Sequence, residues 1–273
     1  MTALACLIMM GGCRAEQPEQ VPNDNRILDE TPAEPLPAVE APYNRARLLL
    51  TVVRAASAHA AGLDDSDIQR VLDGKQFEVK LRFGCDGRGP LGNHGWSVDP
   101  DGKILRLRAA PTLSLQDEVV RSVATESVEA AEGFWLTRPW LLQAACPMGG
   151  PVTPPRVQPG ETQNSNPEEP SPEPASIQRV GLAQFFGAED SRTRQRLGQA
   201  FEAVIQLEEG QTVGSQGFDL VVSGRLRAGA DGRVILCSGD DADQPPDCIV
   251  SATIDRVRIE NPEDKAVLAE WSV

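Results

Sequence analysis

The sequence predicts an α+β protein of two small domains. The first holds two helices and a sheet, and the second is mostly antiparallel β, as a sandwich or a small barrel. One observation is that two acidic, proline-rich segments, 13–43 and 151–176, divide the 273-residue chain. Proline removes backbone donors, so these segments are expected to be an extended tether and an extended linker. The others are a helical period that begins at residue 44 and strict apolar alternation in later segments. The predicted domains are therefore 44–150 and 177–273.

The first domain is expected to begin with two helices. Residues 44–61 carry apolar side chains at helical spacing, at Leu48, Leu49, Val52, Val53, Ala56 and Ala60. Gly62 is expected to end this helix. Asp64 is expected to start a second helix, with acidic groups at the positive end of its dipole, and Gly74 to end it.

The rest of the first domain is expected to be mainly strand. Residues 77–83 and 105–108 alternate strictly between apolar and polar side chains, which is typical of half-buried strands. Residues 119–130 fit a helix or a strand equally well. The domain therefore combines two N-terminal helices with a sheet.

The second domain is predicted to contain strands throughout. Apolar positions alternate in six segments: 179–186, 201–207, 218–227, 234–237, 249–259 and 267–271. Asp231 and Gly232 are typical of a hairpin turn. The apolar phase slips between Ile254 and Val257, which predicts a β-bulge in the longest strand.

The N-terminus carries the most specific motif. An apolar stretch ends in Met10-Gly11-Gly12-Cys13, and the sequence turns polar at Arg14. It resembles the end of a bacterial lipoprotein signal peptide, whose lipobox is a large apolar residue, two small residues and a cysteine. The resemblance implies a signal peptide at 1–12 and acylation of Cys13, with palmitate among the chains. Arg14 in place of an aspartate implies the periplasmic side of the outer membrane. An ordinary secretory signal is the alternative. No Lys or Arg precedes the apolar stretch, so the natural start is expected upstream of residue 1.

The cysteine count favours export. Cys6 leaves with the signal peptide and Cys13 takes the lipid, which leaves two cysteines in each predicted domain: Cys85 and Cys146, then Cys237 and Cys248. Even numbers are what an oxidising compartment produces. Of the three possible pairings, only 85–146 with 237–248 keeps both disulfides inside domains. Zinc is the alternative, but the sequence has no CxxC or HxxxH pair.

One loop is a weak candidate for a metal site. Residues 239–247 gather four carboxylates, Asp240, Asp241, Asp243 and Asp247. Carboxylate oxygens are ligands that Ca²⁺ prefers, but the spacing lacks the central Gly and terminal Glu of an EF-hand. A solvated acidic loop is therefore the preferred interpretation.

No motif indicates catalysis or a cofactor. The glycine-rich run 84–96 contains His94 but no phosphate-loop pattern, so a surface loop is expected there. His59 is expected to pack, partly buried, at the edge of the first helix. Ser215 does not lie in a GxSxG pattern. A recognition patch could use three tryptophans, but scarce aromatic side chains are usually in the core: Trp96, Trp135 and Trp140.

Charge and hydropathy restrict the function. The net charge of −14 argues against a nucleic-acid-binding protein, and the longest apolar run, 3–12, is too short to span a bilayer. The sequence predicts an exported, lipid-anchored cell-envelope protein, attached to the membrane through its N-terminal lipid. Its expected role is a non-catalytic binding or assembly module for an envelope protein or a polysaccharide. Two alternatives stay open: an envelope hydrolase that uses scattered acidic residues, and a Ca²⁺-dependent adhesion module that uses loop 239–247.

Overall fold

The computed structural model describes residues 40–85, 93–147, 178–190, 195–208, 213, 216–229, 231–239 and 244–273. Ala41–Val273 form one compact unit, which is mostly β with some helix. The lipobox predicted at Cys13 and the whole of the predicted linker 151–176 lie outside the described residues.

Helix α1 (Arg45–Ala60) opens the unit, and the side chain of its N-cap residue Asn44 accepts a hydrogen bond from the backbone N–H of Arg47. The helix buries five side chains of its apolar stripe: Leu48, Leu49, Val52, Ala55 and Ala56. Val53 and Ala60, expected on the same stripe, are exposed instead. Helix α2 (Ser66–Leu72) follows, and the carboxylate of Asp64 accepts from the N–H of Ser66.

The ambiguous residues 119–130 contain both structures. Helix α3 (Glu118–Val123) ends there and strand β5 (Val128–Trp135) begins there. Both expectations were therefore correct over part of the segment, because one element ends before the other starts.

Among the described residues, the larger sheet has eight strands, in the order β1-β8-β10-β6-β5-β4, with β9 and β11 also paired to β10. Besides β5, its strands are β1 (Gln76–Phe83), β4 (Leu113–Ser114), β6 (Val180–Gly187), β8 (Phe218–Leu226), β9 (Ile235–Ser238), β10 (Asp247–Glu260) and β11 (Val267–Ser272). The β6–β10 pair is parallel and the other pairs are antiparallel.

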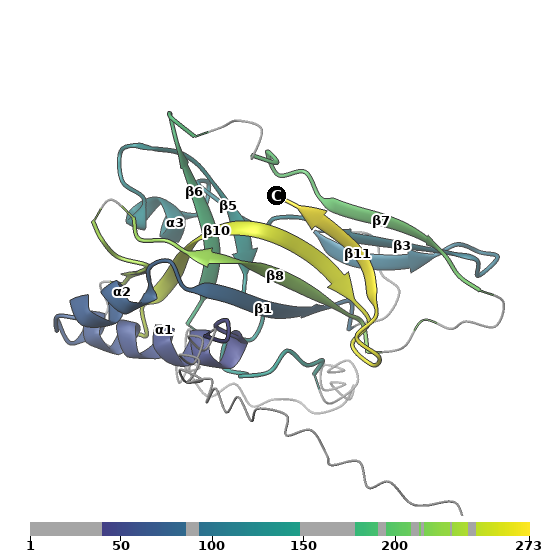
Figure 1. Ribbon diagram of the computed structural model, residues 1–273, viewed down its shortest axis with the longest axis horizontal. Helices are drawn as coiled ribbons and strands as arrows, with labels where there is room; N and C mark the ends of the chain where they lie inside the picture. The colour runs from purple at the N-terminus through teal and green to yellow at the C-terminus, as the bar shows by residue number, and fades with distance from the viewer. Residues whose placement is uncertain are drawn as a thin grey trace, which may run out of the picture. The chain divides into compact units, whose positions relative to one another are not determined.

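Strand β10 is the centre of this sheet and crosses the unit as a long yellow ribbon (Figure 1). Along one edge it pairs first with β9 and then with β8, and along the other with β6 and then β11. The register shifts between Ile254 and Arg256, which confirms the predicted bulge. A hairpin of β8 and β9 was expected around Asp231 and Gly232, but these two strands are not paired with each other in the described residues. Both strands pair with β10 in succession instead.

The smaller sheet is antiparallel, in the order β2-β3-β7, with β2 (His94–Val98), β3 (Ile104–Ala109) and β7 (Phe201–Gln206). Helices α1 and α2 lie at one end of the unit and this sheet at the other (Figure 1). The expectation of a surface loop over 84–96 was wrong for the residues that form β2, while 86–92 lie outside the described residues.

The predicted division into separate domains, 44–150 and 177–273, is wrong. β1 pairs with β8, β3 with β7 and β5 with β6, and each of these pairs joins the two segments. In the part of the second segment that the structure describes, the strands therefore form no sandwich or small barrel of their own. Alternation shows which face of a strand is buried but does not identify its partner, and here the partners lie across the proline-rich segment.

Two apolar clusters lie on opposite faces of the larger sheet. The main one combines α1 with Val79, Leu182 and Val250, and also contains residues of the smaller sheet such as Leu107 and Phe201. The second gathers under α3 and contains Leu113, Val120, Ala131, Ala183 and Ile249. Side chains alternate along a strand, so the neighbours Leu182 and Ala183 point to different clusters.

Candidate functional site

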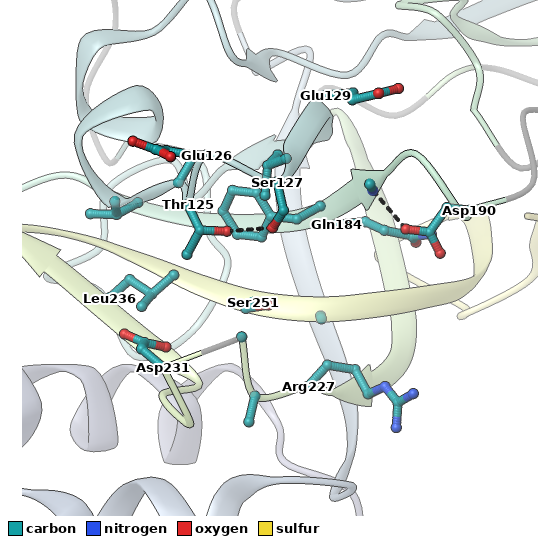
Figure 2. A pocket seen from close by; sticks show the side chains of 18 of the residues that line it. Thr125, Glu126, Ser127, Glu129, Gln184, Asp190, Arg227, Asp231, Leu236 and Ser251 are labelled. Carbon is teal, nitrogen blue, oxygen red and sulfur yellow. Dashed lines mark hydrogen bonds between the residues drawn. The ribbon is translucent and has the colours of Figure 1, made fainter.

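A pocket of about 560 Å³ opens beside α3, on the face of the larger sheet that carries the second cluster (Figure 2). Its floor includes Phe185 of β6, Leu236 of β9, and Ser251 and Thr253 of β10. These side chains share a face with Ile249 because they lie at even spacing along β10 or opposite it in register. The sheet therefore supplies a partly apolar floor.

Three segments from distant parts of the sequence form the rim: residues 123–129 from the end of α3 into β5, residues 187–190 at the end of β6, and residues 227–229 with 231 after β8. They bring five exposed carboxylates to the pocket, from Glu126, Glu129, Glu189, Asp190 and Asp231. Figure 2 labels Glu126 and Glu129 from the first segment, Asp190 from the second and Asp231 from the third. Arg227 is the one basic residue among the described residues that line it.

Hydrogen bonds fix parts of the rim. Asp190 Oδ2 accepts from the backbone N–H of Gly187 at 2.7 Å, which closes the turn after β6. The hydroxyls of Thr125 and Ser127 bond to each other at 3.0 Å. These contacts hold two of the three rim segments in shape without using Glu126 or Glu189.

Gln184 of β6 lines the pocket and links β6 to the backbone of β10. It is buried, and its Oε1 accepts from the N–H of Ile254 at 2.8 Å, at the bulge of β10. In the described residues β6 pairs with β10 only as far as Ser251, and β11 begins to pair at Arg256. The amide of Gln184 satisfies a donor in the gap between them, so the pocket lies where two strands diverge along β10.

This arrangement suits binding better than hydrolysis. An apolar floor with a negative rim is complementary to a ligand that has an apolar part and a positive charge. Glycosidases that use a carboxyl pair typically hold their general acid in an apolar pocket, and all five rim carboxyls are exposed.

A neighbouring hollow of about 770 Å³ is lined by residues of α2 and by residues 228 and 231–233. Its acidic side chains hold the fold together. Asp65 pairs with Arg233 at 3.1 Å and accepts from Gln69 Nε2 at 2.6 Å, while Asp73 accepts from the N–H of Ala228. These carboxylates explain how α2 is docked to the sheet, and they do not indicate a ligand.

The same sheet face carries an ion-pair network beyond the pocket. Lys80 lies 2.6 Å from Glu260, and Arg258 bridges Glu260 and Glu78 at 2.5 and 3.0 Å. Burial alone would raise the pKa of Glu260, but hydrogen bonds from Lys80 and Arg258 together lower it. The charged groups on this part of the face therefore pair with one another.

Both predicted disulfides are present. Cys85, after β1, is bonded to Cys146, and Cys237 of β9 to Cys248 of β10. Cys237 and Cys248 are direct partners in register, with Cα atoms 4.1 Å apart. The first disulfide ties the segment after β5 to the end of β1, and the second fastens the edge strand β9.

Of the four aspartates in the acidic loop, the structure describes Asp247 alone. Asp247 accepts from the N–H of Arg179 at 2.7 Å and from its guanidinium at 2.7 and 2.9 Å. Asp240, Asp241 and Asp243 lie outside the described residues. In the part of the chain that the structure describes, no group of three or more His, Cys, Asp or Glu is arranged to hold a metal ion.

The histidines lie away from the pocket. His94 is in β2, with its ring 6.1 Å from the rings of Phe83 and Phe134. Its Nε2 is buried without a hydrogen-bond partner among the described residues, and burial lowers its pKa. His59 is half-buried near the end of α1, as expected.

The three tryptophans named from the sequence do not form a patch. Trp96 is buried and donates to the carbonyl of Gly84 at 3.1 Å, and Trp135 is partly buried beside α3. Trp140 was expected in the core, but 57 % of it is exposed. Sequence reasoning missed the pocket, and no local pattern marks it, because its walls come from three distant segments.

No known protein family matches the chain, and neither a curated protein nor a solved structure shows significant similarity to it. In the described residues, no helix has both the length and the apolar character needed to cross a membrane.

Proposed function

We propose that this chain is an exported cell-envelope protein, acylated at Cys13 on the periplasmic side of the outer membrane, that acts as a non-catalytic binding or assembly module. The observation that carries the binding role is the pocket beside α3, with its partly apolar floor and its five exposed carboxylates. The ligand that fits is a basic segment of an envelope protein that also carries apolar side chains.

The disulfides support the exported location. Two bonds that fasten a strand and a loop are typical of proteins that fold in an oxidising compartment. Alkylation of protein taken from its native host under a quench should find the thiols of Cys85, Cys146, Cys237 and Cys248 blocked. Free thiols at these four positions would refute export.

The binding role is tested by site-specific photocrosslinking in intact envelopes. A photoreactive amino acid at Ser127, on the pocket rim, should capture a defined partner. The same group at Ser57, an exposed position on α1, is the control. Changing Glu126→Lys and Glu189→Lys reverses two rim charges without removing a hydrogen bond that shapes the rim, and should abolish the product at Ser127. Identical products at both positions, or a product that survives the charge reversal, would contradict the proposal.

The anchor is tested separately. Mass spectrometry of the mature N-terminus should find Cys13 as the first residue with acyl chains attached. An unmodified cysteine there would remove the anchor from the proposal.

A further inference from the structure

The residues after β5, 136–147, form a segment without helix or strand that we call the strap. Within it, the N–H of Leu141 donates to the carbonyl of Arg138, which closes a turn with Pro139 and Trp140 at its tip. Pro139 restricts its own φ, and Arg138 has φ +50°, a conformation that costs a non-glycine residue about 1 kcal/mol. The chain thus adopts a defined and strained turn here.

A buried arginine holds this turn. Arg45 Nη2 donates to the carbonyls of Thr137 and Arg138 at 2.7 and 3.0 Å, and Nε donates to that of Leu141 at 3.0 Å. Its Nη1 reaches the carbonyl of Lys80 on β1 at 3.1 Å. The disulfide at Cys146 then fixes the far end of the strap. The strap is therefore fastened at both ends to the sheet and to α1.

The fastened strap presents apolar side chains to the outside. Trp140 is 57 % exposed and Leu142 is 45 % exposed. The chain has only four tryptophans, and its aromatic content is 4 %. Because the turn is already ordered, these two side chains can be buried by a partner at little further entropic cost.

The charge of this region differs from that of the chain as a whole. The net charge is −14, yet the sequence has no Asp or Glu between Gly133 and Gly160 and has Arg138 and Arg156 there. An anionic membrane surface repels the acidic parts of the molecule but not the strap. Trp is also the side chain that settles at the headgroup level of a bilayer.

The strap lies where the tether joins the compact unit. Arg45, which binds three of its carbonyls, follows Ala41, the first residue of that unit, by four positions. The strap is therefore close to the point at which the chain from Cys13 enters the compact unit.

We propose that Trp140 and Leu142 form a membrane-contact surface that inserts into the headgroup region of the phospholipid layer in which the anchor is embedded. This rests on the proposed lipid anchor. The acyl chains supply most of the attachment, and the strap orients the unit so that the pocket beside α3 stays free for a ligand.

Vesicle binding without the lipid tests this surface. The mature chain from residue 13, with Cys13→Ser, is sedimented with vesicles of phosphatidylethanolamine and phosphatidylglycerol. The double variant Trp140→Ala, Leu142→Ala should bind at least about tenfold more weakly, since two apolar side chains lose their contact. A matched control, Leu197→Ala with Val204→Ala, removes two other exposed apolar side chains and should bind as the parent does.

Two further observations separate loss of the surface from loss of the fold and from loss of the anchor. Equal unfolding midpoints for the parent and both variants show that the surface, not the fold, was changed. No binding by the parent, or equal binding by the strap variant, would overturn the inference, as would capture of a protein at Trp140 in envelopes with no effect on vesicle binding. Vesicle binding that depends on the strap supports it even if Cys13 proves unmodified in cells, so the two proposals fail separately.

Discussion

Replacing Arg45 should destabilise the fold by an amount that its contacts define. The residue is 5 % exposed, and its guanidinium donates to four backbone carbonyls, with no carboxylate partner among them. Burial and the nearby Arg138 lower the pKa of Arg45 to about 10, so it remains charged at neutral pH. In Arg45→Met, the long apolar side chain keeps the volume while the four carbonyls lose their donor.

The expected loss is about 3 kcal/mol. Each hydrogen bond to a charged group contributes about 1.5–3 kcal/mol, but the buried charge itself has a desolvation cost, and water can reach some of the freed carbonyls. For a unit of this size, about 3 kcal/mol lowers Tm by roughly 6–12 °C. Arg45→Lys should recover only part of the loss, because an ammonium has three donors and cannot span the fork.

Urea unfolding with intact disulfides, followed by tryptophan fluorescence, measures this loss. Arg54→Met is the matched control, since Arg54 is on the same helix and exposed, and should change stability by less than about 0.5 kcal/mol. Chymotrypsin should also cut Arg45→Met faster at Trp140. Equal unfolding midpoints for the two methionine variants would show that the guanidinium does not hold the strap.

Three further predictions follow from buried or crowded groups. Burial lowers the pKa of His94 below its usual value near 6.5, so stability should be complete above about pH 6.5 and fall as the pH drops below it; His94→Asn should flatten this part of a pH series of urea midpoints, and parallel curves would contradict it. Removing Cys85–Cys146 should cost about 4 kcal/mol and removing Cys237–Cys248 about 3 kcal/mol, because the first closes the longer loop; the reverse order in calorimetry would count against chain entropy as the cause. A Cβ on Gly224 would lie 2.0 Å from the carbonyl oxygen of Thr253, so Gly224→Ala should lose about 2 kcal/mol or more in urea unfolding, and a neutral effect would show that β8 can shift away.

Local features of the fold could be read from the sequence because neighbouring residues determine them. The alternation of 77–83 indicated β1, the phase slip after Ile254 indicated the bulge, and the cysteine counts indicated both disulfides. Each of these signals lies within one element or follows from the number of cysteines in each segment.

Long-range pairing could not be read in the same way. The eight prolines of 151–176 suggested a boundary between domains, but β5 and β6 pair directly although this segment separates them in the chain. Strand β2 was missed because glycines dominate the run that contains it. The pocket depends on which strands diverge along β10, and this is a property of the assembled sheet.

The exposure of Trp140 was missed for a related reason. Composition predicts that a tryptophan is buried, but the contacts of Arg45 with the backbone of the turn and the disulfide at Cys146 hold the strap in place with this side chain outside. A charged residue on the apolar side of α1 was the available signal, since a buried arginine needs several acceptors close by.

The central position of β10 has a consequence for the order of assembly. This strand comprises residues 247–260 of 273 and pairs with β6, β8, β9 and β11. Strand β1 pairs with β8, whose first residue comes 135 positions after the last residue of β1. The sheet cannot close until nearly the whole polypeptide is available, and contacts of such long sequence separation form slowly. A chain that stays open until its last strand arrives is well suited to crossing a membrane before it folds, and deletion of residues after 246 should leave no stable remnant.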